Sequence, residues 1–132
     1  MTIDYTKKTN MEDLYNLCNK LELKNVLVIR KGELKKTLKN TKIKNIIINL
    51  DDLGNGTHWV FYSPLHKVYF DSYAQLAPNE IPKNTKLAST KKQLQSIEST
   101  DCGALCCLFA YYLNNKSKEQ FYSLFQDVYP AP

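Results

Sequence analysis

Apolar side chains recur at helical spacing near the start of the chain. Thr9 is followed three residues later by Glu12, a capping-box pattern that is typical of a helix N-terminus. The spacing after it predicts an amphipathic helix from residue 11 onward. The apolar stripe of this helix holds Met11, Leu14, Tyr15, Cys18 and Leu21. Because Cys18 lies on this stripe, we interpret it as a core residue.

Four shorter apolar runs are typical of strands. They span residues 26–29, 46–50, 58–62 and 67–71. Lys31-Gly32 marks a turn after the first run, and residues 51–56 form a glycine-containing loop after the second. The last two runs flank Ser63-Pro64-Leu65-His66, so together they predict a β-hairpin.

The hairpin brings two polar residues together if its turn is centred on the bond between residues 64 and 65. Tyr62 then faces Lys67, and His58 faces Asp71. Facing residues point to the same side of a sheet with Cβ atoms about 5 Å apart. This register predicts that Asp71 orients His58, whereas a loop one residue longer or shorter would break the pairing. The alternative is that Asp71 merely ends a strand.

The C-terminal half alternates between irregular and helical patterns. Residues 75–92 are rich in Pro, Asn and Lys, so we expect them to be largely irregular, with room for one helical turn. Residues 103–113 are strongly apolar and lack Pro, which predicts a buried helix. A second capping box at residues 117–120 predicts a last helix. Its apolar positions are Phe121, Leu124 and Phe125.

Composition fits one globular domain kept inside a cell. The 132 residues are 43% hydrophobic, and neither a repeat nor a linker divides them, so we expect a single domain over residues 1–132. No apolar run is long enough to span a bilayer, and residues 1–5 lack the hydrophobic segment of a signal peptide. We therefore expect no membrane contact, no secretion, and reduced thiols rather than a disulfide framework.

Positive charge is concentrated in the first part of the chain. Residues 1–50 hold 11 Lys or Arg against 5 Asp or Glu, while residues 51–132 are nearly balanced. The basic residues 31–44 could contact nucleic acid. The simpler interpretation is a solvated surface, because no aromatic or Arg-rich readout motif accompanies these lysines. The lysines concerned include Lys35, Lys36, Lys39, Lys42 and Lys44.

Three of the four cysteines lie together, and one of them has the setting of a nucleophile. Cys102 lies where an irregular segment enters the apolar helix, and a helix N-terminus favours the negative charge of a thiolate. Gly103 lets a substrate backbone approach closely. Cys106 and Cys107 lie inside the apolar helix, so we interpret them as small core residues.

A cysteine nucleophile also needs a base and donors for the oxyanion. The base must be His58 or His66, the only histidines, and the hairpin register favours His58. An amide donor could come from Gln95 or Gln93, which precede Cys102 by seven and nine residues. Glutamines are usually solvated, so the spacing alone leaves that choice open.

Zinc is the rival chemistry for these cysteines. Cys102 and Cys106 are four residues apart and could share a helix face. Structural zinc sites usually combine two short Cys or His pairs, and the second pair is missing here, since His58 and His66 lie eight residues apart. We therefore predict no metal site.

The order of the candidate residues resembles that of the adenain-like cysteine proteases, which include the adenovirus maturation protease and relatives in virophages and other large DNA viruses. The SUMO-specific proteases share this order of His, acidic residue, Gln and Cys. The resemblance covers residues 54–113 well and residues 9–50 only in layout. It is carried by Gly56-Thr57-His58-Trp59, Tyr69-Phe70-Asp71-Ser72, Gln95, Asp101-Cys102-Gly103 and the cysteine pair that follows.

The resemblance implies an α+β fold of the papain-like superfamily. In it, a central antiparallel or mixed sheet packs against a buried helix that bears the catalytic cysteine at its N-terminus. It further implies that Cys102 is the nucleophile, His58 the base and Asp71 its orienter, with the Gln95 amide and the Cys102 N–H binding the oxyanion. Trp59 and Gly103 are expected to contact substrate.

The implied role is processing of viral capsid or core precursor proteins during assembly. We accordingly expect a monomer acting on protein substrates in the nucleus or viral factory of an infected cell and in the virion. No cofactor is required by the sequence, although DNA or an activating peptide could take part. The adenovirus enzyme holds its peptide by a disulfide, and no cysteine lies just upstream of Gln95. Alternatives are a protease that removes SUMO or ubiquitin, and an inert binding module with a protease fold.

Overall fold

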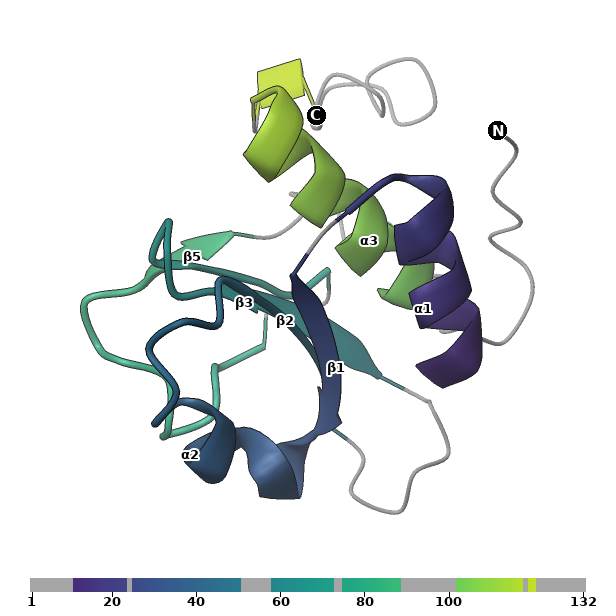
Figure 1. Ribbon diagram of the computed structural model, residues 1–132. Coiled ribbons are helices and arrows are strands. Elements are labelled where there is room, and N and C mark those ends of the chain that lie inside the picture. Colours follow the sequence, from purple (N-terminus) through teal and green to yellow (C-terminus); the bar gives the residue numbers. More distant parts are fainter. Residues whose placement is uncertain are drawn as a thin grey trace.

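A five-stranded mixed sheet forms the centre of the molecule (Figure 1). The computed structural model describes residues 11–23, 25–50, 58–72, 75–88, 102–117 and 119–120. The helices are α1 (Met11–Lys20), α2 (Leu34–Thr37), which follows the 3-10 turn η1 (Lys31–Glu33), and α3 (Cys102–Asn115). The strands are β1 (Val26–Arg30), β2 (Asn45–Asn49), β3 (Trp59–Ser63), β4 (Val68–Phe70) and β5 (Lys86–Ala88).

The strands are arranged in chain order, β1-β2-β3-β4-β5. The inner pairs β2–β3 and β3–β4 are antiparallel, and the outer pairs β1–β2 and β4–β5 are parallel. The chain is therefore an α+β protein with a mixed sheet, as the sequence predicts. Among the helices of the described residues, none has the length and apolar character needed to cross a membrane.

Both faces of the sheet are covered, and each has its own apolar layer. The helices α1 and α3 pack on one face, and α2 lies on the other (Figure 1). The inner strand β2 is buried throughout, with Ile47 facing α1 and α3 while Ile46 and Ile48 face α2. Alternation along a strand buried on both faces explains why this run is apolar without interruption.

The helix α3 is buried along its first nine residues, Cys102 to Ala110. Its sequence is apolar on all sides because α1 covers it from one direction and the sheet from the other. The Phe109 ring stacks on Phe70 at 4.4 Å between centroids and meets the edge of Phe61 at 5.9 Å. These aromatic contacts fix the helix against β3 and β4, and so fix the position of its first residue.

Two elements were missing from the sequence prediction. The predicted turn at Lys31-Gly32 belongs to a longer helical segment, because Leu34 is buried in the second apolar layer and the Glu33 carboxylate accepts the Arg30 N–H at 3.1 Å. The segment 75–92 was expected to be irregular, but it contains β5. That strand is short and largely exposed, and it forms through backbone pairing with β4 rather than through an apolar pattern of its own.

Candidate active site

The predicted nucleophile lies at the start of α3. Cys102 is the first residue of this helix, and its thiol is buried. The Trp59 backbone N–H donates a hydrogen bond to the Cys102 Sγ at 3.2 Å. A backbone donor and a helix N-terminus both favour negative charge on sulfur. Cys102 is therefore placed with a backbone donor at its sulfur and a helix N-terminus beside it.

His58 and Asp71 form a hydrogen-bonded pair beside it. The His58 Nε2 lies 3.1 Å from the Asp71 Oδ1. The imidazole side chain is 15% exposed and the carboxylate 2% exposed, so solvent screens their interaction only weakly. The sequence prediction that Asp71 accompanies His58 is thus met in the structure.

Strand pairing positions the backbones that carry these side chains. His58 immediately precedes β3, and its carbonyl accepts the Leu50 N–H at 2.9 Å. Asp71 immediately follows β4, and its N–H donates to the Ala88 carbonyl at 3.0 Å. The short strand β5 therefore holds the carboxylate in place, and the sheet presents both groups at the end where α3 begins.

The predicted hairpin register is wrong by two residues. Tyr62 faces Tyr69 rather than Lys67, because residues 64–67 form a four-residue turn in which Lys67 has a positive φ of 54°. Since a shift of two keeps each side chain on its original face, His58 and Asp71 remain on one side as diagonal neighbours. Diagonal pairs in a sheet lie about 7–8 Å apart, which an imidazole and a carboxylate can bridge.

The surroundings of His58 favour its charged form. Burial alone lowers the pKa of the imidazole, but hydrogen bonds to Asp71 and to Cys102 and the negative charge of those two groups raise it. The net effect raises the His58 pKa from 6.5 to about 9. The ring is therefore mostly protonated at neutral pH, the state that stabilises a neighbouring thiolate.

Other predicted site residues are placed as follows. Gln95, the predicted oxyanion donor, lies outside the described residues, as do its alternative Gln93 and the segment 51–57 before His58. Gly103 is buried in the first turn of α3. The Trp59 side chain is 1% exposed and belongs to the core, so its expected contact with substrate stays a prediction.

The second histidine is in a different setting. His66 is exposed in the hairpin turn, where its backbone N–H donates to the Ser63 Oγ at 3.1 Å. The structure thus joins His58 rather than His66 to an acidic partner, in agreement with the choice made from the hairpin pattern.

The remaining cysteines are core residues, as predicted. Cys18, Cys106 and Cys107 are buried free thiols in the apolar layer between α1, α3 and the sheet. Burial raises the pKa of Cys106 well above its ordinary value. Within the described part of the chain, no group of three or more His, Cys, Asp or Glu side chains could hold a metal ion.

The sequence reasoning missed the backbone contributions. The Trp59 N–H contacts the Cys102 sulfur, and the Ala88 carbonyl holds Asp71. A backbone group leaves no residue-type signal, so neither contact could be predicted from the pattern of side chains. The buried Ser72 side chain next to Asp71 is a further polar group that the pattern did not single out.

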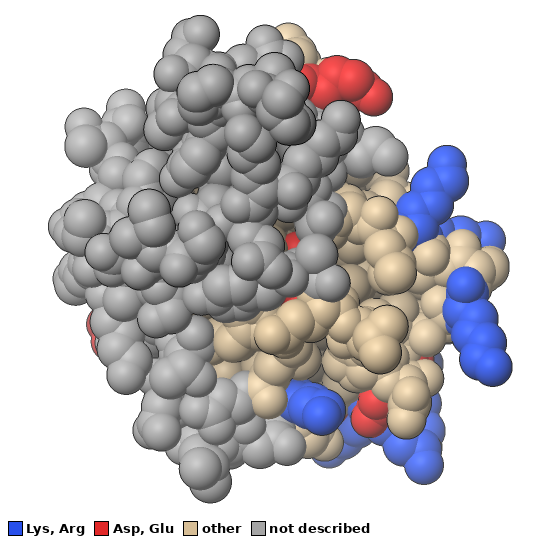
Figure 2. All heavy atoms as spheres, turned by 180° about the vertical axis from the view of Figure 1, so that it is seen from behind, with Lys and Arg blue, Asp and Glu red and all other residues tan. Residues whose placement is uncertain are grey.

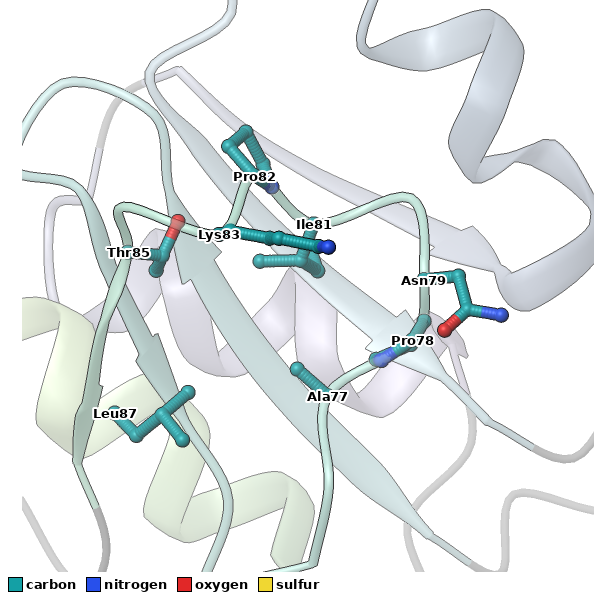
Figure 3. A pocket seen from close by; sticks show the side chains of 8 residues that line it. All are labelled: Ala77, Pro78, Asn79, Ile81, Pro82, Lys83, Thr85 and Leu87. Atoms are coloured by element: carbon teal, nitrogen blue, oxygen red, sulfur yellow. The ribbon is translucent and has the colours of Figure 1, made fainter.

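A shallow pocket lies elsewhere in the fold. It has a volume of about 240 Å³ and is lined by residues of the single segment 77–87 (Figure 3). Ala77 and Ile81 also pack against the second apolar layer, on the side of α2. The pocket lining includes none of the predicted site residues.

The lysines of residues 31–44 are exposed, in keeping with a solvated or ligand-facing surface. Figure 2 shows that Lys and Arg side chains gather along one margin of the face that it presents.

Comparison of the chain with protein-family models, with curated proteins and with solved structures gives no match. A histidine–carboxylate pair alone also occurs as a structural ion pair. Here a cysteine at a helix N-terminus lies beside the pair.

Proposed function

We propose that the protein is a cysteine endopeptidase with an adenain-like, papain-type arrangement of its catalytic groups. The observation that carries this proposal is the His58–Asp71 pair at 3.1 Å beside a cysteine that begins α3. The same three residue types are the ones needed for acyl transfer through a thiolate.

In the proposed reaction, the Cys102 thiolate attacks the carbonyl carbon of the scissile peptide bond. Because Asp71 engages the Nε2 of His58, the Nδ1 is the atom that exchanges protons with the reacting groups. Protonated His58 gives its proton to the leaving amine, which leaves a thioester on Cys102. His58 then takes a proton from water, and the resulting hydroxide hydrolyses the thioester.

Negative charge on the tetrahedral intermediate needs donors. We assign this role to the Cys102 backbone N–H and the Gln95 side-chain amide, the latter on the resemblance of chain order alone. Asp71 stabilises the imidazolium and holds the ring in orientation, as in Cys-His variants of the catalytic triad.

The proposed substrates are viral capsid or core precursor proteins, cleaved in an infected cell and in the virion. The resemblance to adenain-like proteases supports this class. Removal of SUMO or ubiquitin is the competing substrate class, since the SUMO-specific proteases share the same order of residues.

Limiting alkylation tests the proposed site. Wild type, His58→Ala and His66→Ala are treated with limiting iodoacetamide from pH 4 to pH 9, and the label on each cysteine is located by peptide mapping. Because all four thiols are buried, burial by itself does not favour any of them. We expect Cys102 to label fastest well below pH 8 and to lose about 10- to 100-fold in rate in His58→Ala.

The His66→Ala variant is the matched control and should label like wild type. Equal rates for Cys102 in wild type and His58→Ala would contradict the thiolate–imidazole pair and favour an inert binding module. Electrophilic ubiquitin and SUMO probes then separate the substrate classes. Rapid capture of either probe by Cys102 would replace precursor processing with deconjugation.

A further inference from the structure

Two buried cysteines from distant parts of the chain meet between α1 and α3. The sulfurs of Cys18 and Cys107 lie 3.8 Å apart, although 89 residues separate them in sequence. The Cys107 thiol also lies 4.0 Å from the Leu14 carbonyl, one helical turn before Cys18. The Cys107 side chain therefore projects onto the face of α1 at the position where Cys18 points back toward α3.

The two thiols are not equivalent. Cys18 is 3% exposed, while Cys107 is fully buried. The interaction between the two thiols lowers the pKa of Cys18, while that same interaction and burial raise the pKa of Cys107. Cys18 therefore carries more thiolate character and is also nearer to solvent, so it is the first of the two to meet a small oxidant.

We propose that Cys18 and Cys107 form a redox modification site, at which a small peroxide converts the two thiols into a disulfide that joins α1 to α3. This site differs from the predicted nucleophile and does not depend on the proposed protease activity. The sulfurs must approach by about 1.8 Å to reach bonding distance, a movement that side-chain rotation within packed helices can supply.

The chemistry balances with hydrogen peroxide as the oxidant. The Cys18 thiolate attacks one peroxide oxygen and releases hydroxide, which leaves a sulfenic acid on Cys18. The Cys107 sulfur, deprotonated in this step, attacks the Cys18 sulfur and displaces the second hydroxide. The two thiols are oxidised by two electrons, the peroxide is reduced, and the released protons convert both hydroxides to water.

The bond would close a loop of 89 residues and attach the N-terminal helix to the helix that carries Cys102. A link across so long a loop restricts the unfolded chain strongly. We expect the melting temperature to rise by about 5–15 °C on oxidation and to return to its original value after reduction.

The test uses the full chain with Cys102→Ser, which removes the proposed nucleophile from the redox chemistry. The protein is treated with hydrogen peroxide, blocked with iodoacetamide under denaturing conditions, and digested with trypsin without reduction. Cys18 and Cys107 fall in the tryptic peptides 9–20 and 93–116. The expected product is these two peptides joined, with Cys106 carbamidomethylated and a mass two hydrogens below the sum of the two peptides in that state.

Cys106→Ala is the matched control, since Cys106 is the helical neighbour of Cys107 and is equally buried. The link should survive in Cys106→Ala and vanish in Cys18→Ala and Cys107→Ala. Circular dichroism before oxidation confirms that each variant is folded. Absence of the linked peptide in the Cys102→Ser protein, or its persistence in Cys107→Ala, would overturn the proposal.

Discussion

His58 carries its charge in a mostly buried position because acidic groups surround it. Its imidazole side chain is 15% exposed, and the Asp71 carboxylate at 3.1 Å is 2% exposed. Breaking such a pair by removing one charge leaves the other buried and unpaired, which typically costs about 3–5 kcal/mol. The protonation of His58 therefore depends on Asp71, and this dependence can be measured.

Replacing Asp71 with asparagine should release the proton of His58 at lower pH. The amide keeps the size of the carboxylate but removes its charge, so we expect the His58 pKa to fall from about 9 toward 6.5. Proton NMR of the imidazole Cε1–H signals follows the titration, and His66→Asn assigns the two signals. An unchanged His58 titration in Asp71→Asn would show that Asp71 does not hold the proton.

The same proton makes stability depend on pH. The folded pKa of His58, about 9, lies above its ordinary value of 6.5. The stabilisation it contributes is therefore complete below about pH 6.5 and is lost as pH rises through 9. Between pH 6.5 and pH 9.5, we expect wild type to lose about 2 kcal/mol more unfolding free energy than His58→Gln. Urea unfolding at both pH values measures the difference, and parallel losses would contradict it.

At the scale of single residues, the sequence predicted which side chains meet but not the strand register that brings them together. His58, Asp71 and Cys102 were identified from residue type and order, and the structure brings all three together. The pairing register was wrong because the positive φ of Lys67 allows a four-residue turn, which the apolar pattern does not encode. The Trp59 backbone donor could not be found from side chains at all.

Among the elements, α3 determines where the proposed nucleophile lies. Cys102 is its first residue, and the Phe109 ring two turns later is fixed between Phe61 and Phe70. Phe109→Ala should lower the free energy of unfolding by about 3–5 kcal/mol, since it leaves a cavity at the contact between helix and sheet. Urea unfolding measures the loss, and alkylation of Cys102 should slow because its helix is held less firmly.

Leu65→Ala is the control for that variant, because Leu65 is 57% exposed in the hairpin turn. Its substitution should change stability by no more than about 0.5 kcal/mol. Equal losses of unfolding free energy in Phe109→Ala and Leu65→Ala would mean that the aromatic contacts do not hold α3 in place.

The elements that the sequence predicted well are those with an apolar pattern of their own. The helices α1 and α3 and the strands β1 to β4 lie within one or two residues of the expected bounds. Both elements that were missed depend on partners distant in sequence. The segment η1–α2 is held by burial of Leu34, and β5 by backbone bonds to β4, so neither shows a periodicity that could be read locally.

The second capping box predicts a helix that begins near residue 117, and the structure shows the capping hydrogen bond of its first turn. Ser117 accepts the Gln120 N–H at 3.1 Å, as the capping-box pattern requires. The predicted continuation through Phe121, Leu124 and Phe125 lies outside the described residues.

For the whole molecule, the two faces of the sheet carry different features. The helix α3, which begins with Cys102, covers one face of the sheet, and α2 lies on the opposite face (Figure 1). The exposed lysines of residues 31–44 belong to this opposite side. A polyanion bound to these lysines would therefore lie on the side of the sheet opposite α3.

If the basic residues 31–44 contact nucleic acid rather than solvent alone, duplex DNA should bind weakly and without sequence preference, with a Kd of about 10⁻⁶–10⁻⁴ M at physiological salt. Changing Lys35, Lys36 and Lys39 to Gln should weaken DNA binding. The slope of log K against log salt concentration should fall in magnitude by up to about 3. The matched control changes three other exposed lysines, Lys67, Lys83 and Lys86, to Gln. Fluorescence anisotropy over a salt series measures both sets.

The two sets remove the same charge, so net charge alone predicts equal losses from both. A larger loss of DNA affinity from the set at 35, 36 and 39 would locate the contact on the α2 side. Equal losses of affinity would assign the binding to overall charge. Alkylation of Cys102 in the presence of saturating DNA completes the argument. If DNA binds on the side of the sheet that α2 covers, it should not slow the labelling of Cys102. Protection of Cys102 would instead place the polyanion over the candidate site itself.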